Sequence, residues 1–309
     1  MLEDVRALLQ DRLQAAGFRP DPQTLKLVTF RISDTGQTEL RSLFLLLRPP
    51  RTERAFCAYH LGTGAALTRF LVAGLGLSRT KTAEIATLGA IAQLIFALFD
   101  RALDTGGHAL ALQPIPSAKA GGEDAAPEQR LLNRLLTLYY ARLDALAPPA
   151  AHPVRALLEQ AIRRLYEAEL RSAPPPDAAN PNPSSLPPKC LKRAWWRKNT
   201  LPVIVMGLPA WILVSGGRNI KFIEHLQWLA RVGEFFGWLD DFCDYEEDSR
   251  SGHINRLRLE DAVPITALAC RAGDRGRRVL SLWDARNTDS PSRDTFRVLS
   301  WTWLTKPEL

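Results

Sequence analysis

The segment 219–248 constrains the fold more than any other part of the chain, because it is apolar on almost every side and then becomes strongly acidic. At about 100° per residue, Trp228, Phe235 and Trp238 lie on one side of a helix. Ala230 and Gly233 lie on the opposite side. A helix that is apolar all round belongs in the interior of a protein. We therefore expect a central, buried helix that carries carboxylates at its C-terminal end.

Composition indicates that the rest of the chain is helical too. Leu and Ala supply 49 and 39 of the 309 residues, against 23 for Val and Ile together. Since β-branched residues favour strands, this balance favours helices. A hydrophobic fraction of 46% with 24% charged residues is typical of soluble globular proteins. We expect one all-α domain over residues 1–309, a helical bundle around a central apolar cavity, with a Pro-rich loop at 173–188.

Apolar residues at helical spacing and breaker residues predict where the other helices lie. The stretch 24–47 fits either a strand or a helix, and composition favours the helix. Helices are expected at 82–104, 128–146, 153–171, 191–215, 260–271, 275–285 and 294–304.

Two acidic motifs end the helices 82–104 and 219–248. Asp100 and Asp104 are four residues apart, so they share a helix face, as do Asp240, Asp244 and Asp248. Small and apolar residues continue the same face in both helices, away from the carboxylates. We expect the two helices to face each other across an apolar cavity with an acidic rim. Mg²⁺ suits such a rim, because it binds one or two carboxylates together with phosphate oxygens; the alternative is two solvated acidic helix ends.

The charge balance fits an anionic ligand. The chain has a net charge of +7 and a pI of about 9.5. Arg197 and Lys198 precede one buried stretch and Arg250 follows the second acidic motif, where they could bind a diphosphate or simply be solvated. Four cysteines without a CxxC pair predict reduced thiols. The N-terminus lacks a signal peptide pattern, and the uncharged run 200–217 contains prolines and glycines. We therefore expect a cytoplasmic protein with no integral membrane segment.

At the two acidic motifs the sequence resembles the class I terpenoid synthase superfamily. Asp100 and Asp104 match the outer acids of its DDxxD motif, with Arg101 at the place of the second acid. Asp240, Asp241, Asp244 and Asp248 fit the spacing of the second motif of the cyclases, (N/D)Dxx(S/T)xxx(E/D). The same region also resembles the second DDxxD of prenyl diphosphate synthases. The segments 101–105 (RALDT) and 244–248 (DYEED) are similar to motifs of squalene and phytoene synthases, although 106–108 read Gly-Gly-His where those enzymes have acids.

The resemblance implies an all-α fold around a prenyl-binding cavity and three Mg²⁺ ions that bind the substrate diphosphate. The implied catalytic and metal-binding residues are Asp100, Asp104, Asp240, Asp244 and Asp248, and Asp241 is an implied metal ligand. The implied substrate-binding residues are Lys198, Arg197, Arg250, Arg69, Gly233, Gly237 and Phe96.

Because the GGKRxRP signature of chain-elongating enzymes is missing, the sequence favours a terpene cyclase that acts on one prenyl diphosphate. The alternatives are a prenyltransferase, including head-to-head coupling, and a non-catalytic protein that binds prenyl groups or diphosphate. The +7 charge is expected to serve a diphosphate and not nucleic acid. A homodimer is one of the assembly states that remain open.

Overall fold

The computed structural model describes residues 2–34, 41–47, 49, 51–104, 127–146, 153–172, 187–214, 221–260, 262–285 and 290–305. Every regular element in these ranges is a helix, which confirms the predicted all-α class. The elements are α1 (Leu2–Ala15), α2 (Pro22–Asp34), α3 (Arg41–Leu47), η2 (Arg51–Glu53), α4 (Arg54–Val72), α5 (Arg79–Asp104), α7 (Pro127–Leu146), α8 (Pro153–Ser172), α9 (Pro188–Gly207), α10 (Ala210–Leu213), α11 (Phe222–Cys243), α12 (Tyr245–Ser251), α13 (Arg256–Leu259), α14 (Ile265–Asp284) and α15 (Ser290–Leu304). Most of the predicted Pro-rich loop, 173–186, lies outside the described residues.

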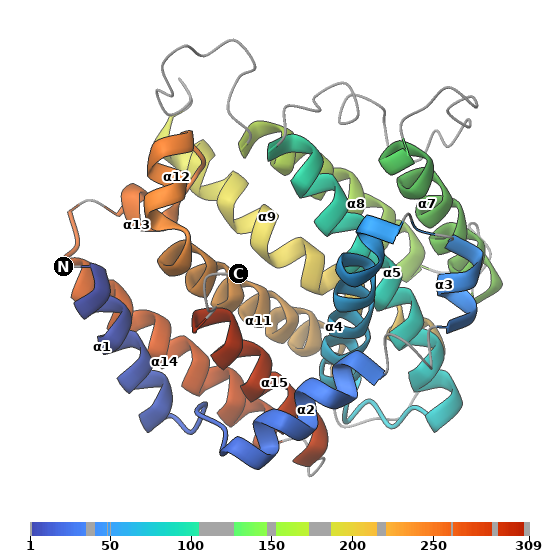
Figure 1. Ribbon diagram of the computed structural model, residues 1–309, viewed down its shortest axis with the longest axis horizontal. Coiled ribbons are helices and arrows are strands. Elements are labelled where there is room, and N and C mark those ends of the chain that lie inside the picture. Colours follow the sequence, from blue (N-terminus) through green and yellow to red (C-terminus); the bar gives the residue numbers. More distant parts are fainter. Residues whose placement is uncertain are drawn as a thin grey trace.

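The helices α9 and α11 run side by side through the middle of the molecule (Figure 1). On one side of them lie α1, α14 and α15, and on the other side α4, α5, α7 and α8. The helix α2 packs against both α4 and α15 and so joins the two sides. The helix α9 packs against both α5 and α11, the two helices whose C-terminal ends carry the acidic motifs.

Glycines let the long helices α4 and α5 approach closely. A Cβ atom on Gly89 would lie 1.8 Å from the Thr68 hydroxyl oxygen, and one on Gly64 would lie 2.8 Å from the Gly89 carbonyl oxygen. Only glycine leaves room for backbones this close. The helix α5, which carries Asp100, is consequently packed closely against α4.

Three predicted helix boundaries were wrong, each for a local reason. The predicted helix 191–215 divides into α9 and α10 at Pro209, which has no N–H to donate. After the division Trp211 N donates to Leu208 O, three residues earlier in the chain. The predicted helix 219–248 divides at Asp244 into α11 and α12. The two predicted helices 260–271 and 275–285 are one helix, α14. Its glycines Gly273 and Gly276 pack against Arg12 and Phe235 and do not interrupt it.

The buried side chains form one continuous hydrophobic core that includes residues from α1 to α15. The helix α5 is long and apolar enough to cross a membrane by length and composition, with a mean hydropathy of 1.7 in its most apolar window. However, 61% of that window is buried against other parts of the molecule. This is the burial of a core helix and agrees with the expected absence of an integral membrane segment.

Candidate functional site

Lys198 of α9 lies at the centre of a group of carboxylates. Its Nζ atom donates a hydrogen bond to Asp100 Oδ1 of α5 at 3.1 Å and lies 3.5 Å from Glu169 Oε2 of α8. Asp240 of α11 is near enough to stabilise the charged lysine as well. We call these four residues the Lys198 cluster. Three carboxylates from three helices thus converge on one ammonium group.

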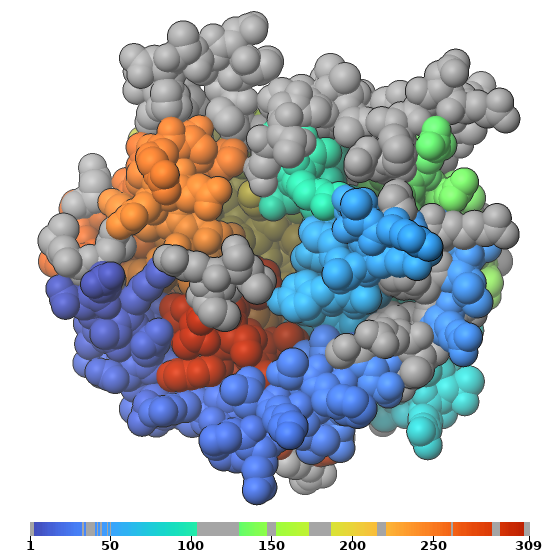
Figure 2. All heavy atoms as spheres, in the orientation of Figure 1, coloured from blue at the N-terminus to red at the C-terminus, as the bar shows by residue number. Residues whose placement is uncertain are grey.

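The electrostatics of the Lys198 cluster keep the lysine charged. Burial alone would lower the pKa of Lys198, but Glu169, Asp100 and Asp240 outweigh burial and raise the pKa well above its ordinary value. Glu169 is the most buried of the acids that bond Lys198, with 11% of its side chain exposed, whereas Asp100 is 48% exposed. The cluster therefore has one open side, at Asp100. A recess in the surface opens between α12 and α4, with the colours of α9 and α11 at its floor (Figure 2).

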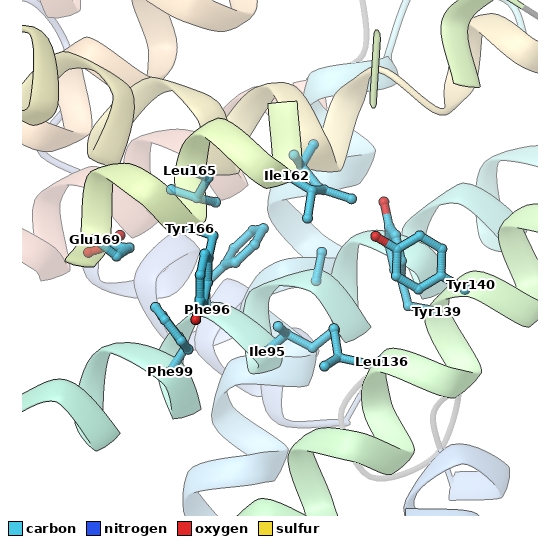
Figure 3. Close-up of a pocket in the computed structure, with 12 residues that line it drawn as sticks. Ile95, Phe96, Phe99, Leu136, Tyr139, Tyr140, Ile162, Leu165, Tyr166 and Glu169 are labelled. Atoms are coloured by element: carbon cyan, nitrogen blue, oxygen red, sulfur yellow. The ribbon is translucent and has the colours of Figure 1, made fainter. Parts of the chain in front are cut away.

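An apolar pocket adjoins the Lys198 cluster. It lies between α5, α7, α8 and α9, with Glu169 at one end and Tyr139 and Tyr140 at the other (Figure 3). Aromatic side chains of Phe96, Phe99 and Tyr166 line it near Glu169. The sequence predicted the cavity directly between the two acidic helices, but the residues that line this pocket come from α5, α7, α8 and α9, and none comes from α11.

The pocket is narrow. Its volume is about 30 Å³, the space of about one water molecule. The hydroxyl groups of Tyr139 and Tyr166 are buried beside it and have no hydrogen-bond partner in the structure. Loss of solvent raises the pKa of Tyr139, so this hydroxyl stays neutral. The pocket thus combines an apolar wall with two hydroxyl groups, and a ligand larger than water would require its aromatic side chains to rotate.

The second acidic motif spans the end of α11 and the beginning of α12. The α11 helix ends at Cys243, and Asp244, with φ −104° and ψ 12°, forms a kink before α12. Asp240, on α11, faces the Lys198 cluster, and its Oδ1 atom accepts a hydrogen bond from Trp303 Nε1 at 3.2 Å. Asp248, on α12, accepts a hydrogen bond from Asn255 Nδ2 at 2.9 Å. The i to i+4 hydrogen bonds nevertheless continue through the kink, because Asp244 N donates to Asp240 O and Asp248 N donates to Asp244 O, each at 2.8 Å.

Asp241, which the sequence predicted as a metal ligand, accepts hydrogen bonds from within the protein. It is only 4% exposed, and its Oδ2 atom accepts hydrogen bonds from Trp195 Nε1 at 2.7 Å and from the backbone N–H of Arg256 at 2.8 Å. Burial, together with the charge of Asp240, raises the pKa of Asp241 well above its ordinary value. One carboxylate oxygen is thus used to hold α9 and α13 against the end of α11.

Asn255 is a residue that the sequence analysis missed. It is 1% exposed, and its Nδ2 atom donates both to the Asp241 carbonyl and to Asp248 Oδ2, each at 2.9 Å. Its Oδ1 atom accepts from the N–H of Leu257 and so caps α13. Asn255 thereby fixes the position of α12 relative to α11. An asparagine before a short apolar helix is too common for the sequence to have revealed this role.

Glu169 was missed as well, although a signal was present. The buried face of α8 carries Leu158, Ile162 and Leu165, and Glu169 continues that face four residues after Leu165. A carboxylate on an apolar helix face is costly unless it has a partner, and Lys198 supplies that partner. A search for acids on buried faces would have found it.

The other predicted substrate-binding residues fall into different places. Phe96 lines the apolar pocket. Gly233 and Gly237 do not line it: added Cβ atoms would lie 2.5 Å from Asn199 O and 2.4 Å from Asn199 Cγ, so these glycines allow α11 to pack closely on α9. Arg250 is exposed, and its Nε atom donates to the Glu246 carbonyl of its own helix.

Arg197 and Arg69 lie among residues that do not belong to the Lys198 cluster. Partial burial and the neighbouring Arg164 and Arg193 lower the pKa of Arg197, which places it among surface arginines of α8 and α9. Arg69 lines a separate groove near the other end of α5. The backbone of Asp104 ends α5, and its side chain lies outside the described part of the structure. No tryptophan lines the apolar pocket.

The described residues contain no group of three or more His, Cys, Asp or Glu side chains arranged to hold a metal ion. They do contain the ammonium group of Lys198, which Asp100, Glu169 and Asp240 approach. No protein-family model matches the chain, and a comparison with curated proteins also finds no match. The site must therefore be interpreted from its own chemistry.

Proposed function

We propose that the protein is a Mg²⁺-dependent class I terpene synthase, which ionises an allylic prenyl diphosphate and lets the resulting carbocation cyclise. One observation carries the proposal: the Lys198 cluster lies at one end of an aromatic, apolar pocket. A prenyl diphosphate has the same division into a charged head and a hydrocarbon tail. The charged residues match the head, and the apolar lining of the pocket matches the hydrocarbon character of the tail.

The carboxylates present are compatible with the metal that this chemistry needs. Mg²⁺ is commonly held by one or two carboxylates plus phosphate oxygens, so a complete protein cage is not required. Asp100 and Asp240 would hold it, and Asp104, Asp244 and Asp248 are proposed to assist. When bound, Mg²⁺ supplies positive charge that stabilises the departing diphosphate.

The chain's own residues have separate tasks in this reaction. Lys198 donates hydrogen bonds to the diphosphate as the carbon–oxygen bond breaks and the electron pair moves to the diphosphate oxygen. Glu169 holds Lys198 in place. The π faces of Phe96, Phe99 and Tyr166 stabilise the carbocation in the pocket. The cation then loses a proton or is captured by water.

The tail can enter the pocket only after a side-chain movement. A chain of ten or more carbons does not fit into about 30 Å³. Phe96 and Tyr166 are half-buried and lie near the Glu169 end, so their rotation would open the pocket without moving a helix. We therefore propose that substrate binding shapes the cavity.

The decisive experiment is a product analysis. The protein is incubated with Mg²⁺ and prenyl diphosphates of ten, fifteen, twenty and more carbons, each with and without isopentenyl diphosphate, and the organic extract is examined by mass spectrometry. We expect one prenyl diphosphate alone to give a hydrocarbon or an alcohol. Asp240→Asn, Asp244→Asn and Lys198→Met should each abolish turnover while leaving the circular dichroism spectrum unchanged. Glu246→Gln, which neutralises an exposed acid of α12, is the matched control and should retain activity.

Other results would replace the proposal with an alternative. Consumption of isopentenyl diphosphate would identify a chain-elongating prenyltransferase, and joining of two prenyl diphosphates would identify head-to-head coupling. A Mg²⁺-dependent thermal shift with prenyl diphosphates, without any product, would identify a binding protein. Full activity of Asp244→Asn would contradict the metal-binding role of the second acidic motif.

A further inference from the structure

A groove lies between α4 and α5, near the turn that joins them, and has no part in the proposed reaction. Its volume is about 620 Å³, within the range of small-molecule sites. Ala65, Ala83 and Ala86 supply small apolar side chains to its wall. Arg69 of α4 and Arg79 and Thr82 of α5 add polar groups. The groove thus offers an apolar surface next to two guanidinium groups.

The groove is distant from the Lys198 cluster. Ala83 and Asp100 are 17 residues apart on the same straight helix, which corresponds to roughly 25 Å. Arg69 is near the C-terminal end of α4, which runs antiparallel to α5, so it lies at the same far end. A diphosphate at Asp100 is out of reach of Arg69. Arg69 therefore lies apart from any substrate bound at the Lys198 cluster.

The charge around the groove favours an anion. Arg69 and Arg79 are basic, and no acid is among the residues that line the groove. The groove also adjoins the first turn of α5, where Ser78 O accepts from Thr82 N, and a helix N-terminus carries partial positive charge. The Thr82 hydroxyl can donate a hydrogen bond, whereas the Thr87 hydroxyl already donates to the Ala83 carbonyl at 2.9 Å.

We propose that this groove is a second binding site, which takes a phosphate ester with an apolar tail. Guanidinium groups match phosphate oxygens in paired hydrogen bonds, so Arg69 and Arg79 recognise the head group. The tail lies along Ala65, Ala83 and Ala86. The site goes beyond the proposed synthase activity and does not depend on it, because it uses none of the residues of the Lys198 cluster.

The test measures binding of octyl phosphate by isothermal titration calorimetry in EDTA, which keeps divalent metals out of the Lys198 cluster. We expect one molecule to bind per chain. The double variant Arg69→Ala/Arg79→Ala should weaken binding at least tenfold. Arg79→Ala and Ala83→Trp change exposed positions that do not support the core, and each should weaken binding as well. Arg277→Ala/Arg278→Ala, which removes two exposed arginines of α14, is the matched control and should not change binding.

Two further arms separate this site from the proposed active site and from other anions. Lys198→Met should bind octyl phosphate like the unaltered protein; loss of binding in this variant would place the ligand at the Lys198 cluster and overturn the inference. Octyl phosphate should bind at least tenfold more tightly than octanoate, and equal affinities would overturn the phosphate assignment. Unchanged binding by Ala83→Trp would show that the groove is not the site. Each of these results can be obtained whether or not the protein turns over prenyl diphosphates.

Discussion

At the scale of single residues, the charge balance around Lys198 sets the chemistry of the site. Two of its acidic neighbours lie within 3.5 Å of Nζ, and both arrive from helices distant in sequence. A cation is needed here for stability as well as for binding, because Asp100, Glu169 and Asp240 would otherwise repel one another. In the folded protein the lysine therefore supplies the positive charge that these carboxylates require.

Removing that ammonium should expose the repulsion between the carboxylates. We expect Lys198→Met to lower the free energy of unfolding by about 1–2 kcal/mol at pH 7, since part-buried ion pairs contribute more than exposed ones. Because the pKa of Lys198 is raised in the folded state, its contribution is complete below the ordinary value of 10.5 and falls as the pH rises above it. Urea denaturation of both proteins at several pH values and in EDTA measures the difference. Equal stabilities at pH 7 would contradict the repulsion argument; Lys198→Arg, which keeps the charge, is the control.

Asp241 provides a second prediction, with the same direction of pH dependence in a lower pH range. Its pKa is raised in the folded state, so between the ordinary value of 3.8 and the folded value the folded protein binds more protons than the unfolded chain. Stability should therefore fall as the pH rises through this window. Asp241→Asn keeps an oxygen acceptor for Trp195 and Arg256 and removes the charge, so it should be at least as stable at pH 7 and lose this slope. Chemical denaturation from pH 4 to 8 in EDTA measures both effects.

A third variant separates charge from hydrogen bonding at Asp241. Asp241→Ala leaves two buried N–H groups without an acceptor and should cost roughly 2–4 kcal/mol. If Asp241→Asn were destabilised as much as Asp241→Ala, the negative charge itself would be stabilising and the direction of the pKa shift would be wrong.

At the scale of elements, close packing of α9 on α11 places Lys198 beside Asp240. Gly233 and Gly237 are the points of closest approach, and both are filled by Asn199, which follows Lys198 directly. Because these contacts are one residue away from the cluster, helix separation and site geometry are coupled. An increase in the distance between the two helices would move the ammonium away from the α11 carboxylate.

Alanine substitutions test this coupling. In Gly233→Ala the new Cβ would lie 2.5 Å from Asn199 O and 2.7 Å from Thr200 Cα, both backbone atoms that cannot rotate away. Overpacking costs about 1–3 kcal/mol, and alanine's higher helix propensity recovers up to about 1 kcal/mol. We expect a net loss of about 1–2 kcal/mol in urea denaturation.

Gly237→Ala is the comparison for that variant, because its new Cβ would lie 2.4 Å from Asn199 Cγ and so would clash with a side chain. In the background of Asn199→Ala the contacts with Cγ and Oδ1 disappear and only the 2.7 Å contact with Cβ remains, so Gly237→Ala should then be less destabilising. No such rescue is expected for Gly233→Ala. Equal behaviour of the two glycines in both backgrounds would contradict the packing described for α9 and α11.

At the scale of the whole molecule, the parts of the chain before and after 173–186 complete a single core. Phe70 of α4 stacks on Phe296 of α15, with ring centroids 4.2 Å apart, and on Trp283 of α14 at 5.5 Å. The helix α1 packs along α14, and α5 packs along α9. Neither part can bury its apolar surface alone, which agrees with the expected single domain.

Dividing the chain tests this interdependence. Residues 1–172 and 187–309 produced separately should each lack a cooperative unfolding transition, because their core faces would be exposed to water. Produced together, they should co-purify and unfold in one transition measured by circular dichroism. A cooperative transition of either fragment alone would indicate two domains.

Local sequence patterns determined much of the fold. Composition indicated the helical class. The spacing of apolar residues predicted the buried α11 and the length of α5 to within a few residues, because side-chain periodicity is a local property of each helix. The breaks at Asp244 and Pro209 and the continuity of α14 were missed. In α14 a contact with a distant element decided the outcome: Gly276 packs on Phe235 of α11, and glycine in a helix carries no such information by itself.

In the candidate site, too, the sequence determined some features and only the tertiary structure decided others. The sequence by itself determined that Asp100, Lys198 and Asp240 sit on defined faces of three helices, since the angle of a residue around its helix follows from its position in the chain. Only the tertiary structure decided that Glu169 joins them, that Asp241 turns away to Trp195, and that the pocket lies against α7 and α8. The physical reason is that the order and separation of helices come from contacts between residues far apart in sequence, such as Gly237 with Asn199, whose partners no local pattern specifies.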